Sequence, residues 1–301
     1  MTNTLINGGN VNKAAVIKKN VSKALIYAVL IIYAIIIIFP FSVVILTSVK
    51  TWKEASSSLV FHFFPRQGFS FEGYLKVFEY KANPDMALPS LIQGFINTIL
   101  YVLPTTLIGL MVGSMSAYCF AKYKFRGSNI MYSILIGTMM IPGAIMMVPS
   151  FSMYDTLGWL DTPLPLIIPG LFSSAACVFF MRQFFTGIPD SILEAAKLDG
   201  LGLVGIFIKM MLPLSVPALI AQGLLGFIGG YNDYLGPLIY LESGSKQTLQ
   251  IALRSVASTY EGQHPNAVMA ATIIALLPTL IIYFIAQDFF IEGIAASAIK
   301  G

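Results

Sequence analysis

The sequence predicts an all-α membrane protein that crosses the bilayer several times. Hydrophobic residues make up 56% of its 301 residues and charged residues only 11%, whereas charged residues make up about 25% of a typical soluble domain. Its mean hydropathy is +0.79. The apolar runs are long and do not alternate in polarity as the strands of a membrane β-barrel do. We therefore expect helical spans.

Six windows are long enough to cross the hydrocarbon core, which takes about 20 apolar residues as a helix. None of them contains Asp, Glu, Lys, Arg or His. They cover residues 24–47, 91–121, 130–154, 162–181, 210–232 and 267–287. We expect residues 1–23 to be an N-terminal tail and residues 24–301 to be one transmembrane domain. The first window is too long for the apolar region of a signal peptide, which favours a retained span.

The basic residues favour cytoplasmic N- and C-termini. In that orientation the inside segments hold eleven Lys or Arg against five acidic residues, and the outside segments hold seven against nine. This asymmetry follows the positive-inside rule. The net charge of +4 is then explained by loops near anionic lipid headgroups, so no nucleic-acid partner is predicted.

The sequence offers no machinery for chemistry of its own. It has no G-x-x-x-x-G-K-[ST] nucleotide loop, and no cluster of His, Cys, Asp or Glu with metal-ligand spacing. Secondary transporters keep ionisable groups inside the membrane for coupling, and the six windows contain none. We predict no catalytic residue, no metal and no bound cofactor, so energy for transport would come from a partner protein.

A short polar segment stands between the fourth and fifth windows. Asp190 is a candidate N-cap for a helix over residues 191–199, and Gly200 suits the left-handed position that ends a helix. A second short helix is expected over residues 203–212, before Pro213. Such short helices need packing to persist.

The first of these helices has a face made mainly of small side chains. Ile192, Ala195, Ala196 and Asp199 share that face at helical spacing. Small alanines beside acidic groups allow the surface of another protein to approach closely. The alternative is an amphipathic helix that lies on the lipid headgroups.

These residues resemble the EAA loop in permease subunits of bacterial ABC importers. The matching positions are Glu194-Ala195-Ala196, Asp199-Gly200, Phe207 and Leu212-Pro213. The resemblance to the carbohydrate-importer branch continues at Ala117-Tyr118, Phe125-Arg126-Gly127, Met140-Ile141-Pro142, Met181 to Phe185, Ile188-Pro189, Pro237 to Leu241, Glu292-Gly293 and Lys300-Gly301. The chain departs from the family pattern at Leu201, Met210 and Ser297.

The resemblance implies the six-span type I permease fold in a bacterial cytoplasmic membrane. It implies a complex with a second permease subunit, an extracytoplasmic solute-binding protein and a cytoplasmic ABC ATPase dimer that binds ATP and Mg. This chain would then be a transport subunit for a carbohydrate, with an oligosaccharide as the expected substrate, and not an enzyme. The alternative class is an energy-independent channel or facilitator.

The resemblance also assigns residue roles. In the family the EAA loop, here residues 182–209, carries the coupling helix that sits in a cleft of the ATPase. The implied coupling residues are Glu194, Ala195, Ala196, Asp199, Gly200, Phe207 and Pro213. In this scheme Glu194 pairs with a basic residue of the ATPase, the two alanines permit close packing, and Gly200 sets the turn.

Five polar residues in or beside the apolar windows are candidates for a sugar pathway, because sugars need hydrogen bonds and aromatic faces. They are Asn97, Gln222, Tyr231, Asn232 and Tyr234. The alternative is hydrogen bonding between helices or an interfacial aromatic belt. The predicted outside segments 50–90 and 233–263 would form either the landing surface for a binding protein or a lid for this subunit alone.

Overall fold

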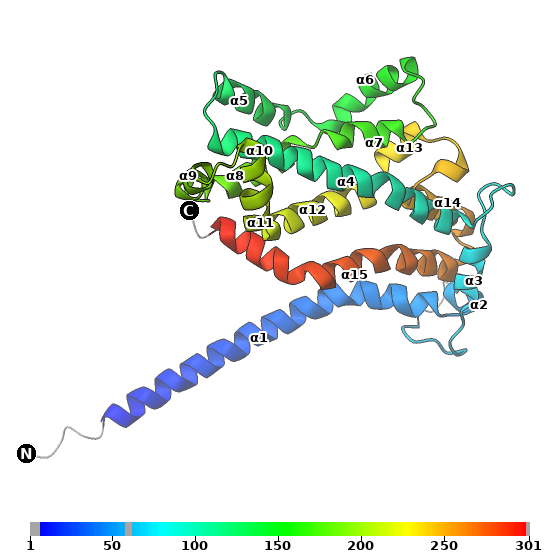
Figure 1. The fold of residues 1–301 in the computed structure, drawn as a ribbon. Helices are drawn as coiled ribbons and strands as arrows, with labels where there is room; N and C mark the ends of the chain where they lie inside the picture. Colours follow the sequence, from blue (N-terminus) through cyan, green and yellow to red (C-terminus); the bar gives the residue numbers. More distant parts are fainter. Residues whose placement is uncertain (1–6, 58–61, 299–301) are drawn as a thin grey trace, which may run out of the picture.

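The computed structural model describes residues 7–57 and 62–298, and the secondary structure of these residues is entirely helical. The long helices run between two ends of an elongated bundle (Figure 1). We call these the α9 end, after α9 (Asp190–Leu198), and the α14 end, after α14 (Leu249–Tyr260). Four helical segments are long and apolar enough to cross a membrane, and two bent helix pairs bring the number to six if each pair is one span.

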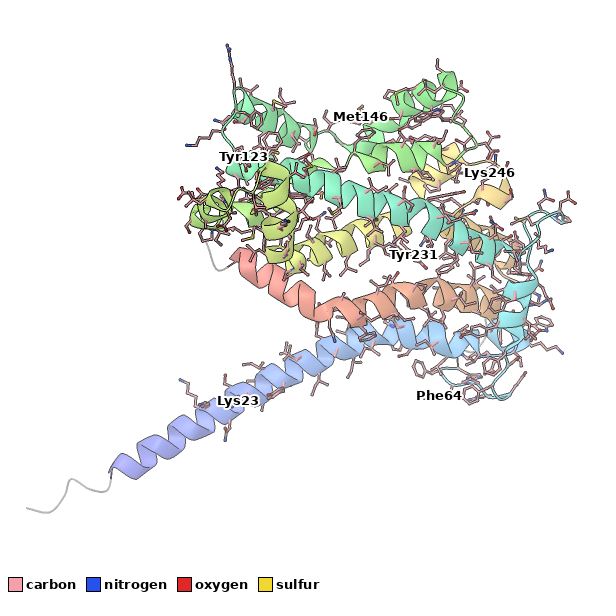
Figure 2. The ribbon with its side chains drawn as sticks, viewed as in Figure 1. Lys23, Phe64, Tyr123, Met146, Tyr231 and Lys246 are labelled. Atoms are coloured by element: carbon pink, nitrogen blue, oxygen red, sulfur yellow. The ribbon has the colours of Figure 1, made fainter. Side chains whose placement is uncertain are left out.

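The first helix, α1 (Asn7–Ser48), is longer than the first window. Residues 7–23, which we expected as a tail, continue the same helix. All side chains from residue 18 to 41 are exposed. The helix leaves the bundle as a long arm and packs on α15 (Pro265–Ala298) only through its last turns (Figures 1 and 2). Residues 1–6 and Lys300-Gly301 lie outside the described residues.

The central element is α4 (Ser90–Lys122), which packs against elements from both ends of the bundle. Two of them, α7 (Leu164–Leu171) and α8 (Ala175–Thr186), form the fourth span. Glycines let these helices meet closely. A Cβ on Gly109 would lie 2.4 Å from the Gly170 carbonyl oxygen, and one on Gly113 would lie 2.2 Å from Ser173 Oγ.

The third and fifth windows are bent pairs of helices. The third consists of α5 (Ser128–Thr138) and α6 (Gly143–Thr156), which meet at 95° where Pro142 interrupts the helix. The fifth bends by 83° at Ser215, which lies between Pro213 and Pro217. Each proline lacks an N–H and so removes a helical hydrogen bond. The segments before this bend are α10 (Leu203–Ile206), the π-helix η1 (Phe207–Met211) and α11 (Leu212–Leu214), and α12 (Val216–Tyr231) follows it.

Shorter helices collect at the α14 end. They are α2 (Trp52–Ala55) and α3 (Glu72–Glu79), which follow α1, and α13 (Leu235–Tyr240) and the 3-10 turn η2 (Gly244–Lys246), which precede α14. They belong to the two predicted outside segments, of which residues 58–61 lie outside the described residues.

The buried side chains form two clusters, one at each end of the bundle. The cluster at the α9 end includes Ala117, Tyr118, Phe185, Leu193, Ala196, Phe207 and Ala218. The cluster at the α14 end includes Val77, Leu91, Tyr231, Val256 and four alanines of α15. Both α4 and α12 contribute to both clusters, so the middle turns of these two helices lie between two packed ends.

Gly109→Ala is expected to destabilise the protein by about 1–3 kcal/mol, because its methyl group would force α4 away from α7. Gly137→Ala is the matched control, since a Cβ there has no atom within 4 Å and alanine favours the helix. Thermal unfolding in detergent measures both. Equal unfolding temperatures for the two variants would show that the close approach of α4 and α7 is not needed for stability.

Candidate functional site

The helix expected in the EAA loop is present as α9, and its end has the predicted geometry. Gly200 has φ +81°, the left-handed conformation that glycine adopts most readily. The Leu201 N–H donates to the Ala196 carbonyl at 3.0 Å, and the Gly200 N–H donates to the Lys197 carbonyl at 3.0 Å. These two bonds are the Schellman motif, which satisfies carbonyls at the end of a helix.

The start of α9 differs from our prediction. Asp190 is the first helical residue and does not cap the helix; Pro189 occupies the N-cap position, without a side-chain hydrogen bond. The Asp190 carboxylate instead accepts a hydrogen bond from Lys122 Nζ at 2.6 Å, and the same ammonium donates to the Ile188 carbonyl at 2.5 Å. The Lys122 ammonium lowers the pKa of Asp190. The base of α9 is thereby bound to the end of α4.

Lys122 is only 4% exposed, whereas Asp190 is 77% exposed. Other contacts strengthen the attachment of the EAA loop. Tyr118 Oη donates to the Leu203 carbonyl at 3.4 Å, and the Arg182 guanidinium lies 4.0 Å from the centre of the Tyr132 ring, a cation–π contact. The loop is therefore fixed to α4 and to α5.

The residues of the EAA pattern divide into an inner and an outer set. Ala196 and Phe207 are buried within this subunit, where the Phe207 ring stacks on Tyr118 with 5.5 Å between ring centres. This corrects the expectation that both alanines share an exposed face, because Ala196 lies one turn from the buried Leu193. Glu194, Ala195, Asp199, Gly200 and Pro213 are exposed.

The outer set includes a residue that the sequence pattern did not single out. Leu198 is 89% exposed and lies on α9 between Lys197 and Asp199, both also exposed. This large apolar side chain, at the end of a polar helix, is available for contact with another surface. Glu194 and Ala195 lie one turn earlier on α9.

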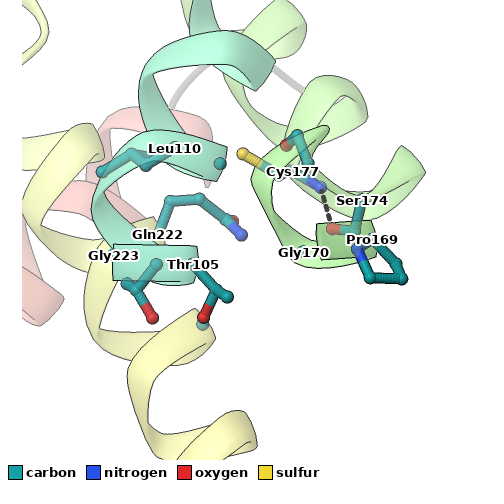
Figure 3. Close-up of a pocket in the computed structure, with 12 residues that line it drawn as sticks. Thr105, Leu110, Pro169, Gly170, Ser174, Cys177, Gln222 and Gly223 are labelled. Carbon is teal, nitrogen blue, oxygen red and sulfur yellow. Dashed lines mark hydrogen bonds between the residues drawn. The ribbon is translucent and has the colours of Figure 1, made fainter. Parts of the chain in front are cut away.

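A cavity of about 390 Å³ opens between α4, α7, α8 and α12 (Figure 3). It is lined by Thr105, Thr106, Gly109, Leu110, Pro169, Gly170, Ser173, Ser174, Cys177, Gln222, Gly223 and Gly226. None of these residues is charged. Along α4 and α12 the cavity lies between the two buried clusters.

Several polar groups of the cavity have hydrogen-bonding capacity to spare. The Gln222 side chain extends toward Cys177 and Ser174 in Figure 3, and it makes no hydrogen bond to any residue that the structure describes. Ser174 Oγ accepts the Cys177 N–H at 3.1 Å and keeps its own proton to donate. Ser173 Oγ is buried beside the Cys177 thiol, and Ser173 has φ +72°.

At the α14 end, residues 242–247 are held by hydrogen bonds from two sides. Asp161 accepts hydrogen bonds from Ser243 N at 2.8 Å, Ser243 Oγ at 2.5 Å and Lys246 Nζ at 2.8 Å. The bond from Lys246, followed by those from Ser243, lowers the pKa of Asp161. From α4, Asn97 Nδ2 donates to the Ser245 carbonyl at 2.8 Å and Tyr101 Oη donates to the Lys246 carbonyl at 3.2 Å. Figure 2 shows Lys246 at the end of the bundle far from Tyr123.

Of the five candidate pathway residues, Gln222 alone lines this cavity. Asn97 is buried, and its amide holds residues 242–247, while the buried Tyr231 hydroxyl donates to the Ala275 carbonyl at 2.8 Å. These are bonds between elements, as the alternative interpretation described. Asn232 is exposed and bonds to the Ile228 carbonyl of its own helix at 2.9 Å. Tyr234 is half-buried beside it.

Comparison with known proteins identifies the family. Residues 109–295 match the family described as the inner membrane component of binding-protein-dependent transport systems. The chain belongs to this family. It is an all-helical membrane permease of the ABC importer type, and the permease has relatives along nearly its whole length.

Two relatives and one solved structure illustrate the similarity. The arabinooligosaccharide transport system permease protein AraQ of Bacillus subtilis is 36% identical over 209 residues, which cover 69% of this chain and 74% of AraQ. The inner membrane ABC transporter permease protein YcjP of Escherichia coli is 32% identical over 285 residues, covering 94% and 99%. A bacterial ABC transporter that imports the acidic polysaccharide alginate shares the fold, with a TM-score of 0.79 at 23% identity, covering 91% and 98%.

Sequence reasoning missed the two polar contacts that organise the ends of the permease. Lys122 ends a long apolar run, a signal that we used only for charge balance. Asp161 and Ser243 are 82 residues apart, and no local pattern links residues so distant. Asp161 does follow Gly158 and precede Pro163, which marks a turn but not its partner.

Asp161→Asn is expected to loosen residues 242–247, because it removes the charge from the bond to Lys246 while Asn still tolerates the left-handed φ of +52°. Amide hydrogen exchange at Glu242 and Ser243 should accelerate about tenfold, as the loss of a charge-assisted hydrogen bond predicts. Asp155→Asn, on exposed α6, is the control. Unchanged exchange in both variants would refute the role of Asp161.

Proposed function

We propose that this permease is a transmembrane subunit of an ATP-driven, binding-protein-dependent importer of an oligosaccharide in a bacterial cytoplasmic membrane. Its six spans would place both termini in the cytoplasm, so that the α9 end faces the cytoplasm and the α14 end faces outward. The family membership supports transport. The sugar is inferred from relatives such as AraQ, whose name specifies arabinooligosaccharides.

The exposed surface of α9 and its attachment to α4 are the observation that supports the coupling role. The helix presents an exposed leucine and an exposed alanine among the charges of Glu194, Lys197 and Asp199, and its base is bound to α4 by Lys122. A helix lying on lipid would have one apolar and one polar side. On α9 the apolar positions 193 and 196 are turned into the subunit, and the outer surface mixes charge with Leu198. Such a surface fits the cleft of a soluble protein better than a lipid surface.

The partner in that cleft would be a cytoplasmic ABC ATPase dimer, which binds ATP and Mg and supplies the energy. A second permease subunit would complete the translocation pathway, and an extracytoplasmic solute-binding protein would deliver the sugar to the α14 end. Moving the transporter from 1:99 to 99:1 between its two orientations requires about 5.5 kcal/mol of differential contact energy. We propose that the contacts between α9 and the ATPase supply this free energy.

Gly200→Val is expected to impair coupling without blocking membrane insertion, because valine disfavours the left-handed φ of +81° by at least about 1–2 kcal/mol. Gly202→Val is a close control: Gly202 has φ −75°, and a Cβ there has no atom within 4 Å. Glu194→Ala tests the charge of the same surface. Co-purification of the ATPase and sugar-stimulated ATP hydrolysis are the measurements.

We expect Gly200→Val and Glu194→Ala to reduce stimulated hydrolysis at least tenfold or to lose the ATPase, and Gly202→Val to behave as wild type. Wild-type assembly and transport in both test variants would refute the docking of α9. Sugar uptake by the permease without any ATPase would instead favour the energy-independent channel.

Lys122→Met is expected to leave the complex assembled but to reduce transport per ATP hydrolysed. The substitution keeps the length of the side chain while removing the bonds to Ile188 and Asp190, so movement of α9 would no longer pass directly to α4. Lys124→Met, at an exposed position two residues away, is the control. The ratio of sugar transported to ATP hydrolysed in proteoliposomes measures the effect, and equal ratios in the two variants would rule out transmission through Lys122.

A further inference from the structure

We propose that the cavity between α4, α7, α8 and α12 binds one neutral sugar unit of the transported oligosaccharide. The inference rests on the proposed function. It adds the class of ligand, the site where the ligand binds, and a residue that recognises it, Gln222. It assigns to this subunit its own contact with the passing sugar.

The size of the cavity limits the ligand. Small-molecule sites commonly measure about 300–1,000 Å³, and the 390 Å³ of this cavity lies near the lower limit. A single sugar ring with its hydroxyl groups suits such a volume, whereas a whole oligosaccharide does not. The oligosaccharide would therefore pass this site one sugar unit at a time.

The polar groups of the cavity suit hydroxyl groups of both donor and acceptor character. The unpaired amide of Gln222 offers one acceptor oxygen and two N–H donors. The Ser174 hydroxyl proton is free to donate. A sugar hydroxyl group could accept from the Gln222 N–H groups or from Ser174, and could donate to the Gln222 oxygen.

The backbone at Ser173 supports the same assignment. A serine at φ +72° is uncommon, and such strained residues cluster at ligand sites, where packing holds them in place. Here the packing comes from Gly113 of α4, where a Cβ would lie 2.2 Å from Ser173 Oγ. The Ser173 hydroxyl therefore packs against α4, and the residue contributes to the cavity wall in this constrained conformation.

The absence of charged residues from the cavity lining disfavours the binding of acidic sugars. No lining residue is charged, so a carboxylate entering the cavity would lose water without gaining a cationic partner there. A smaller cavity of about 80 Å³ also borders Thr105 and contains Asp233, an acidic neighbour. The site accordingly fits neutral units, such as those of arabinooligosaccharides, better than those of an acidic polysaccharide such as alginate.

The test uses the complete transporter, assembled with its partner permease, ATPase and binding protein in proteoliposomes. Gly226→Leu fills the cavity, Gly226→Ala adds a methyl group that has its nearest contact at 3.7 Å from Thr106, and Gly229→Leu places the same bulk where a Cβ has no atom within 4 Å. Gln222→Leu removes the amide at nearly constant volume. Uptake of arabinotriose and of an alginate trisaccharide is measured, together with the yield of the assembled complex.

We expect Gly226→Leu to lower arabinotriose uptake at least tenfold, Gln222→Leu to raise its KM about tenfold, and Gly226→Ala and Gly229→Leu to stay within about twofold of wild type. All four variants should assemble with the partner permease and the ATPase in wild-type yield, which separates a blocked site from a misfolded subunit. The alginate trisaccharide should be taken up at least tenfold less efficiently by wild type.

Wild-type uptake by Gly226→Leu and Gln222→Leu would overturn the site while leaving the proposed function intact. Alginate uptake as efficient as that of arabinotriose would overturn the preference for neutral sugars. A wild-type complex that hydrolyses no ATP in response to either sugar and transports neither would overturn the proposed function, and this inference with it.

Discussion

The close approach of α4 to α7 and α8 is the constraint on which the arrangement depends. Inside a bilayer there is no hydrophobic force between helices, so association relies on packing between surfaces that can come close. Gly109 and Gly113 provide that surface, with the Gly170 carbonyl and Ser173 in the space that side chains would fill. Contact at this depth fixes the walls of the central cavity and leaves the larger side chains to pack at the two ends of the bundle.

The residues of the EAA loop fall into two groups, buried and exposed, that the sequence pattern alone does not distinguish. Ala196 and Phe207 seat the loop in the subunit, while Glu194, Ala195 and Leu198 form its outer surface. The same short segment thus supplies both the buried contacts and the outer surface. The Schellman motif at Gly200 then turns the chain back toward the core, where η1 begins.

Local rules were sufficient for much of the fold. Apolar windows predicted the positions of the four long apolar helical segments and of the two bent pairs, and Gly200 predicted the end of α9, since both depend on neighbours in sequence. The bends of 95° and 83° were not predicted, because proline shows where a helix is weak but the packing around it sets the angle. The inward position of Ala196 and the pairing of Asp161 with Lys246 depend on contacts between distant segments. The sequence did not show which candidate amide lacks a hydrogen-bond partner among the described residues. Asn97 and Gln222 are both amides within apolar windows, and only the structure shows which of them bonds to another element.

The length of α4 gives the permease a mechanical property. Its 33 residues extend about 50 Å at 1.5 Å per residue, with Lys122 bound to α9 at one end and Asn97 bound to residues 242–247 toward the other. Pro104 lacks the N–H that would bond to the carbonyl of Leu100, so α4 lacks one helical hydrogen bond at this turn. Thr105 and Thr106 of the cavity wall follow it directly. Bending of α4 would therefore concentrate beside the cavity, between the two ends of the helix that are held by hydrogen bonds.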